Sequence, residues 1–446
     1  MNAILRAACA ALALAAPSAA LAQHQDHSQH APPAGAQPPA AAPEVAPADD
    51  ENCCWDPVHD PHYGALGRYS WTRESAGTAW QPDSSWHRGV HASLGRWQLM
   101  GHALVNAVYD RQQGPRGDEA GFVSGMAMGS ARRNLGNGHV LQLRAMLSPD
   151  PAMGARGFPQ HFSAGETADG LTTLVDRQHP HDFFMELSAS YSVPLGDQAS
   201  AFLYGGLPGA PAFGPPAFMH RFSAMDSPEA PISHHWLDST HIAFGVVTAG
   251  LAFGDVRIEA SRFNGREPDR HRWNIETGPL DSTAVRFSAN PARSLSLQAS
   301  WAHLVSPEQL APQENETRWS ASAIYTQRVG ARGWWSTTFA WGRRVQDHGD
   351  LDAFTLESAA ALGSWTLFGR AERIETNELL GGGGGHGPAF DVAKVSAGLI
   401  RDFTVAEHVR VGVGGLYALN YVPDGLEASY GGDPDGAMLF LRLRID

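Results

Sequence analysis

Cysteine is scarce in this sequence. Of the three cysteines, Cys9 lies in an N-terminal segment that we expect to be removed, which leaves the adjacent pair Cys53 and Cys54. Adjacent cysteines either form a strained disulfide or offer two thiolates to a soft metal. A secreted scaffold held together by several disulfides is therefore excluded.

Long apolar runs, basic charge and long repeats are also lacking. After the first 22 residues, no stretch reaches the roughly 18 consecutive apolar residues that a membrane helix needs, which excludes a helical membrane protein. The formal net charge of −14 argues against a nucleic-acid partner, because nucleic acid requires a basic face. A β-propeller would show a repeat of about 40 to 50 residues, and the sequence has none.

The N-terminal part is predicted to contain two segments outside the main fold. Arg6, an apolar run and the small-residue site at residues 20–22 indicate a secretory signal over residues 1–22. Residues 23–85 contain several histidines, the Pro/Ala tract 31–48 and the Cys-Cys pair. Such a composition is typical of an extended linker, so we predict a flexible arm without a core of its own.

From Trp97 onward the chain alternates apolar and polar residues, as strands with two different faces do. Leu439, Leu441 and Leu443 share one face of the last block, and Arg442 and Arg444 share the other. Tight turns alternate with long connections along the chain. The long connections are residues 111–121, 148–182, 208–240, 264–281, 306–316, 345–352, 375–391 and 423–437.

Eight long and seven short connections predict an all-β fold, a transmembrane antiparallel β-barrel of about 16 strands (range 14 to 18) over residues 86–446. Its turns are expected in the periplasm, its long loops outside the cell, and the whole in the outer membrane of a Gram-negative bacterium. Aromatic residues near strand ends suit the lipid girdles of such a barrel: Trp301, Trp319, Tyr325, Trp335, Trp341, Trp365, Tyr417 and Tyr421. A soluble β-sandwich is the alternative.

In each predicted strand, every second residue is apolar and is expected to face lipid. The residues that alternate with them are expected to line the lumen. Its charges are mixed and lean basic, which suits either bracing of the interior or a pore for small anionic solutes. The predicted pore-lining residues are Arg144, Glu186, Arg257, Glu259, Arg286, Glu357, Arg370, Glu372, Lys394, Arg410, Arg442 and Arg444.

Histidine is abundant, with 21 residues concentrated in the arm and the loops. Imidazole suits copper, zinc and nickel, and thiolate favours copper(I). The candidate metal ligands are His24, His27, His30, Cys53, Cys54, His59 and His62 in the arm, and His179, His181, His234 and His235 in two long loops. The alternative for the loop histidines is that they hydrogen-bond to one another and hold the loops in place above the lumen. The alternative for the arm is a solubilising linker that binds no metal.

Three short motifs carry a resemblance. Residues 165–170 (GETADG), 176–182 (DRQHPHD) and 263–269 (FNGREPD) are similar to a family of uncharacterised proteobacterial outer-membrane proteins. The similarity extends over most of the chain from about Asp56. Members of that family tend to accompany copper and other heavy-metal resistance genes. The resemblance implies a physiological context and no catalytic residue.

The leading functional hypothesis is a non-enzymatic barrel, either a porin-like pore or a metal-handling envelope protein linked to copper or heavy-metal tolerance. Outer-membrane lipid is the expected surrounding partner, and copper or another soft transition metal the candidate cofactor. The alternative is an outer-membrane lipid-modifying hydrolase with a histidine at the rim. His303 is the candidate, because it lies on the predicted lipid-facing side of its strand. A structural or adhesive barrel is a third hypothesis.

Overall fold

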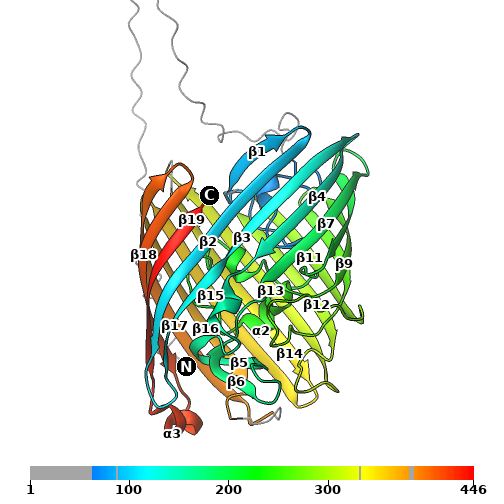
Figure 1. The fold of residues 1–446 in the computed structure, drawn as a ribbon. Coiled ribbons are helices and arrows are strands. Elements are labelled where there is room, and N and C mark those ends of the chain that lie inside the picture. The colour runs from blue at the N-terminus through cyan, green and yellow to red at the C-terminus, as the bar shows by residue number, and fades with distance from the viewer. Residues whose placement is uncertain (1–62, 87–88, 331–332, 381–385) are drawn as a thin grey trace, which may run out of the picture. The chain divides into compact units, whose positions relative to one another are not determined.

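The computed structural model describes residues 63–86, 89–330, 333–380 and 386–446. Sixteen antiparallel strands form a closed barrel in which each strand pairs with its neighbours along the chain and β19 pairs with β2 (Figure 1). The wall strands are β2 (Trp97–Gln112), β3 (Glu119–Gly136), β4 (His139–Leu147), β7 (Phe184–Pro194), β8 (Ala199–Gly206), β9 (Val246–Phe253), β10 (Val256–Phe263), β11 (Ser282–Ala292), β12 (Leu295–Val305), β13 (Asn315–Val329), β14 (Gly333–Gln346), β15 (Gly349–Leu362), β16 (Trp365–Thr376), β17 (Phe390–Ala406), β18 (Val409–Tyr421) and β19 (Asp435–Ile445).

The predicted strand number is confirmed, because each predicted turn and loop separates two consecutive wall strands. Three strands outside the wall were missed: two lie within the long connection 148–182, and the third precedes β2. β1 (Val90–Leu94) forms a hairpin with β2 and pairs with Trp97 to Gly101, beyond the point where Ile445 at the end of β19 pairs with Ala103. β1 therefore continues the line of β19 and covers an edge of β2 that would otherwise expose its backbone groups.

The outer face of the barrel is apolar. Along β19, Leu439, Leu441 and Leu443 are 67, 56 and 40% exposed, whereas Phe440 and Arg442 between them are buried. The girdle positions lie outward too, with Trp319, Trp335, Trp365 and Tyr417 exposed. An apolar belt on a closed sheet satisfies every backbone group while presenting only side chains to lipid. In the described part of the chain, no helix is long and apolar enough to cross a membrane.

The turn end of the interior is filled by residues 63–86, here called the N-terminal insert, which includes η1 (Trp71–Arg73). Leu66, Tyr69 and Trp80 are buried against Phe202 and Ala252 of the wall. The prediction of a flexible arm up to residue 85 is therefore wrong for residues 63–85. These residues have no core of their own, but the barrel supplies one. Residues 23–62 lie outside the described part.

The centre of the interior is filled by residues 208–244, here called the central insert. It contains η3 (Phe218–His220), α2 (His234–Leu237) and η4 (Ser239–His241), and nearly all of it is buried. Its backbone and side chains bond to several strands of the wall, for example Ala212 N to Ser261 Oγ of β10 (2.7 Å) and Trp236 Nε1 to Leu351 O of β15 (3.0 Å). Two cavities that it lines measure about 10 Å³ each, room for about one water molecule.

A third insert, residues 148–183, lies at the loop end and includes η2 (Asp150–Met153), β5 (Phe158–Thr167) and β6 (Thr173–Gln178). β5 and β6 form a separate two-stranded sheet, and most of β5 is buried. Near it, η5 (Asp424–Leu426) and α3 (Glu427–Tyr430) fold in the loop between β18 and β19, and the Tyr430 hydroxyl donates to Asp176 (2.8 Å). The long loops thus fold back into the barrel.

The predicted pore-lining charges face this packed interior, where eleven of the twelve are buried and Arg410 is half-buried. Many bind the inserts. Arg144 donates to the carbonyl of Gly77 (2.5 Å) in the N-terminal insert, and Glu357 accepts from Arg221 Nε (2.6 Å) in the central insert. Paired buried charges satisfy their hydrogen-bonding needs through such contacts. An anion-leaning pore stays a prediction.

Candidate metal centre

Five histidines gather where the central insert meets residues 179–182. His234 and His235 are on α2, His241 ends η4, and His179 and His181 precede β7. All five are buried, with exposed fractions between 1 and 8%. The ring centroids of His234 and His241 lie 5.3 Å apart, as do those of His181 and His241. The rings of His179 and His235 are 5.6 Å apart and extend the group beyond His234.

Each ring is held at Nδ1 by an oxygen. Two bonds are short: His181 Nδ1 lies 2.8 Å from Asp150 Oδ2, and His234 Nδ1 lies 2.8 Å from Asp238 Oδ1. Nδ1 of His241 donates to the backbone carbonyl of Asp238 at 2.7 Å. Longer contacts join His179 to Glu166 (3.3 Å) and His235 to Glu267 (3.2 Å). A carboxylate or carbonyl on one ring nitrogen is the usual arrangement when the other nitrogen binds a metal.

The opposite nitrogens are largely unused. Nε2 of His179, His181 and His241 is buried without a hydrogen-bond partner among the described residues. Buried polar atoms without partners are rare and often mark an ion or water. Two imidazoles bound to one ion about 2.0 Å from each nitrogen, in tetrahedral geometry, place their ring centroids about 5 Å apart. The centroid spacings of 5.3 Å for His181, His234 and His241 are close to this value. Among the described residues their ring nitrogens do not all lie within 4.8 Å of one another, so a shared ion would require the rings to shift.

The charge state of the centre follows from burial. Burial and the Arg272 guanidinium hold the pKa of His179 well below its usual range, and burial with His181 does so for His241. Burial also lowers the pKa of His234, against the opposing Asp238 carboxylate. For His235 burial acts in the same direction, but the Glu267 carboxylate outweighs it and raises the pKa. Neutral imidazole is the form that binds a metal.

The three sequence motifs converge on this centre. Glu166 of the first motif contacts His179 and pairs with Arg272, the second motif supplies His179 and His181, and Glu267 of the third contacts His235. Gly165 allows the approach of the first motif: its φ is +112°, and a Cβ there would lie 3.1 Å from His235 Cε1. A side chain at this position would be strained and would press on the ring.

The sequence predicted His179, His181, His234 and His235 as one group of candidate ligands, and the structure brings them together. His241 was missed; only its position four residues beyond Leu237 of the same insert could have suggested it. His24, His27, His30, Cys53, Cys54, His59 and His62 lie outside the described residues. Metal binding by either set stays a prediction.

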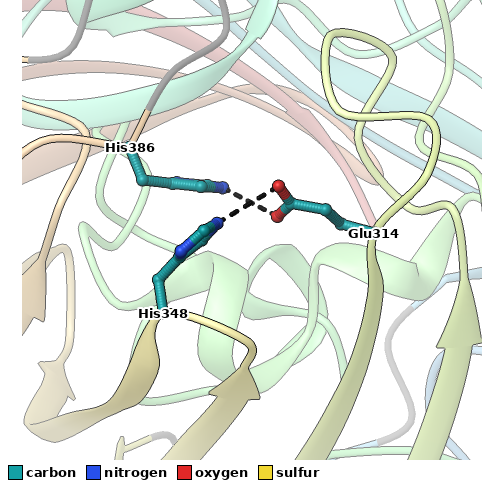
Figure 2. Close-up of side chains that lie close together, drawn as sticks. All are labelled: Glu314, His348 and His386. Atoms are coloured by element: carbon teal, nitrogen blue, oxygen red, sulfur yellow. Dashed lines mark hydrogen bonds and ion pairs between the residues drawn. The ribbon is translucent and has the colours of Figure 1, made fainter.

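A second group of metal-binding side chains lies at the loop end and was also missed. Figure 2 shows the carboxylate of Glu314 facing both His348 and His386, with His348 Nε2 3.2 Å from Oε1 and His386 Nε2 3.1 Å from Oε2. The ligand atoms of these three residues all lie within 4.8 Å of one another. His348 is half exposed, so this rim group is open to the outside. Each residue comes from a different loop, which local sequence patterns do not reveal.

His303, the rim histidine of the hydrolase alternative, lies half-buried near the end of β12. Its Nδ1 is 3.3 Å from the hydroxyl of Thr317 on the neighbouring strand. The pair faces each other across the β12–β13 register. This is an ordinary cross-strand contact, and a hydrolase activity stays a prediction.

Comparisons with known proteins bear on the fold. No protein-family model matches the sequence, and no curated protein does. Among solved structures, a Salmonella typhi OmpF in complex with daunomycin matches with a TM-score of 0.50 and 11% identity, over 80% of this chain and 100% of that one. OprB of Pseudomonas putida matches with a TM-score of 0.47 and 9% identity, over 78% and 94% of the two chains.

OmpT of Vibrio cholerae gives a TM-score of 0.43 at 8% identity, over 80% of this chain and 100% of that one. At such identities only the fold is informative, and the OmpF match supports what the strand pairing shows directly. A closed sheet with an apolar outer belt and alternating short turns and long loops is the structure that bacterial outer membranes accommodate. The chain is a sixteen-stranded antiparallel β-barrel of the outer membrane.

Proposed function

We propose that this barrel is a non-enzymatic, metal-handling protein of the outer membrane that binds a transition-metal ion at the buried histidine centre. The observation that carries the proposal is the set of five buried histidines whose Nδ1 atoms are held by oxygens while three Nε2 atoms have no partner among the described residues. A ring nitrogen that is buried without a partner is free to bind a metal ion or a water molecule.

Copper(II) is the ion we expect to bind most tightly. The affinity of imidazole sites for divalent metal ions is generally higher for copper(II) than for nickel, cobalt or zinc. The resemblance to proteins that accompany copper and heavy-metal resistance genes agrees with this choice. The rim group of Glu314, His348 and His386 offers a first contact for an ion arriving at the loop end.

The packed interior favours this function over a general porin. The N-terminal and central inserts fill the barrel, and the cavities lined by the central insert hold about one water molecule each. A wide aqueous channel for small solutes requires an open lumen. A barrel filled by its own loops suits selective binding of a small ion.

The test is copper(II) titration of the refolded full-length protein by calorimetry and electron paramagnetic resonance. His24, His27, His30, His59, His62, His348 and His386 are replaced by glutamine, and Cys53 and Cys54 by serine, in every sample. The arm and the rim group then do not contribute to binding. The test variant is His181→Gln with His241→Gln, and the control is His271→Gln, an exposed loop histidine. Retained heat-modifiable mobility in electrophoresis shows that each barrel is folded.

We expect the parent and the control to bind one copper(II) with a nitrogen hyperfine pattern. The double variant should bind about ten- to a hundredfold more weakly, as is usual when groups of a metal site are removed. Equal affinity and an identical spectrum in the double variant would overturn the proposal.

A further inference from the structure

A methionine-rich cluster lies beside the histidine centre and is not explained by it. Met126, Met146 and Met185 are buried together with Ile242 and Phe244, and Met128 and Met219 pack against them. Elsewhere the interior wall is lined mainly by charged and hydroxyl side chains. Methionine is a common filler of irregular cores, so the number of methionines alone assigns nothing. The arrangement of two of them with two histidines is what carries the inference.

Three side chains, one histidine and two methionines, form a row across three neighbouring strands of the wall. His102 of β2 pairs directly with Met128 of β3, and Met128 pairs directly with Met146 of β4. Residues directly opposite in an antiparallel sheet have Cβ atoms about 5 Å apart and share a face. Imidazole, thioether and thioether thus stand side by side on one face of the wall, facing the interior where Met146 is 3% exposed.

The central insert completes the row from the other side. His220, the last residue of η3, places Nε2 3.2 Å from Met146 Sδ, and its ring stacks on His102 with centroids 6.1 Å apart. Met219, the preceding residue, packs against the same cluster. Side chains of four separate elements therefore place two imidazoles and two thioethers next to one another on the interior side of the wall.

We propose that His102, Met128, Met146 and His220 form a binding site for a soft monovalent cation, copper(I) or silver(I). Thioether sulfur is a soft ligand that favours copper(I), and imidazole tolerates it. The site's four ligands are all neutral, which suits a monovalent ion better than a divalent one, because a buried divalent ion would retain two uncompensated charges. It differs in chemistry from the all-imidazole centre, and it stands independently of the function proposed above.

Between the two sites lies η3. Phe218 packs its ring on His181 and His234, with centroid distances of 5.8 and 5.4 Å, while His220 two residues later reaches Met146. Ile242, the residue after His241, belongs to the methionine cluster. A single short turn of the central insert thus separates a nitrogen site from a sulfur-containing one.

The experiment is anaerobic copper(I) titration of the refolded full-length protein against a chromogenic copper(I) chelator, with X-ray absorption at the copper edge. Cys9→Ser, Cys53→Ser and Cys54→Ser are present in every sample, so that methionine is the one source of sulfur. The test variant is Met128→Leu with Met146→Leu, which keeps side-chain volume. The control is Met438→Leu, an equally buried methionine of β19 outside the cluster.

We expect the parent and the control to retain one copper(I) with both sulfur and nitrogen scatterers. The double variant should lose the sulfur signal and bind about ten- to a hundredfold more weakly. Equal affinity in the double variant, or nitrogen scatterers alone in the parent, would overturn the site. If the double variant does not refold, His220→Gln, at a partly buried position of the central insert, decides by its affinity for copper(I), which should fall by the same factor. Copper(II) binding at His181 and His241 is measured separately, so failure of one site is distinguishable from failure of the other.

Discussion

Glu229 anchors the central insert to the barrel wall, and neutralising it should loosen the whole interior. The carboxyl group is fully buried and pairs with Lys394 of β17 and, at 3.7 Å, with Arg370 of β16. In Glu229→Gln the shape is kept and the charge is lost. Arg370 retains Glu372 at 3.1 Å, but Lys394, 1% exposed, loses the carboxylate of its ion pair.

Breaking a buried ion pair from one side typically costs about 3 to 5 kcal/mol, because the remaining charge is left without compensation. At about 1.4 kcal/mol per tenfold change, the unfolding equilibrium should shift by about two to four orders of magnitude. The assay is guanidinium unfolding of protein refolded into lipid vesicles, followed by tryptophan fluorescence.

The matched control is Glu407→Gln, in the turn before β18, where the carboxylate is 90% exposed and 3.7 Å from His408. Exposed pairs of this kind contribute little, so its unfolding midpoint should equal that of the parent. If Glu229→Gln and Glu407→Gln unfold at the same midpoint, the wall charges do not hold the insert, and the explanation of the filled barrel fails.

Three further predictions follow from the loops and the filled interior. Burial and the Asp269 carboxylate raise the pKa of Glu276 to about 8. The folded loop therefore keeps this carboxyl group protonated at pH values where the unfolded chain, with the ordinary glutamate pKa of 4.5, has released the proton. The stability of the folded loop should consequently fall as pH rises from about 5 to about 8. Glu276→Gln should abolish this fall, measured as hydrogen-exchange protection of residues 264–281, and an unchanged pH profile in the variant would contradict it. Planar-bilayer conductance of the parent should be low and should rise severalfold when residues 211–240 are deleted; a folded deletion variant that conducts no more than the parent would show that this insert does not block the lumen. With Cys53 and Cys54 replaced by serine, a cysteine at the exposed Asp347 should react with an impermeant label on intact cells and one at the exposed Asp197 should not, whereas the reverse would invert the barrel.

Strand number and pairing order could be predicted because they depend on local signals. Alternation along each strand decides which side chains face lipid, as Leu439 and Phe440 show with exposed fractions of 67 and 3%. β1 escaped prediction because its five residues, Val90–Leu94, are mostly exposed and carry no two-sided pattern. Its place is decided by the free edge of β2 beyond the end of β19.

The candidate site was predictable in part. Motif residues His179 and His181 stand in one extended segment, and His234 and His235 are adjacent, so each pair was visible in the sequence. His241 was not, because its role depends on how η4 turns after Asp238, which binds two of the rings. The rim group of Glu314, His348 and His386 joins three loops that are far apart in the chain.

The sequence by itself determined the sixteen-stranded wall and its two faces, because alternation and connection length are local properties that a closed sheet must obey. The tertiary structure alone decided what fills the wall. Residues 63–86 resemble a linker in composition, yet they are buried because Arg144 and Arg286 of distant strands bond to Gly77 and Thr78. The central insert has only a small core of its own, formed by Phe218, Ala224 and Ala230. The closed barrel supplies the remaining apolar surface and the charges that hold the histidines and methionines together.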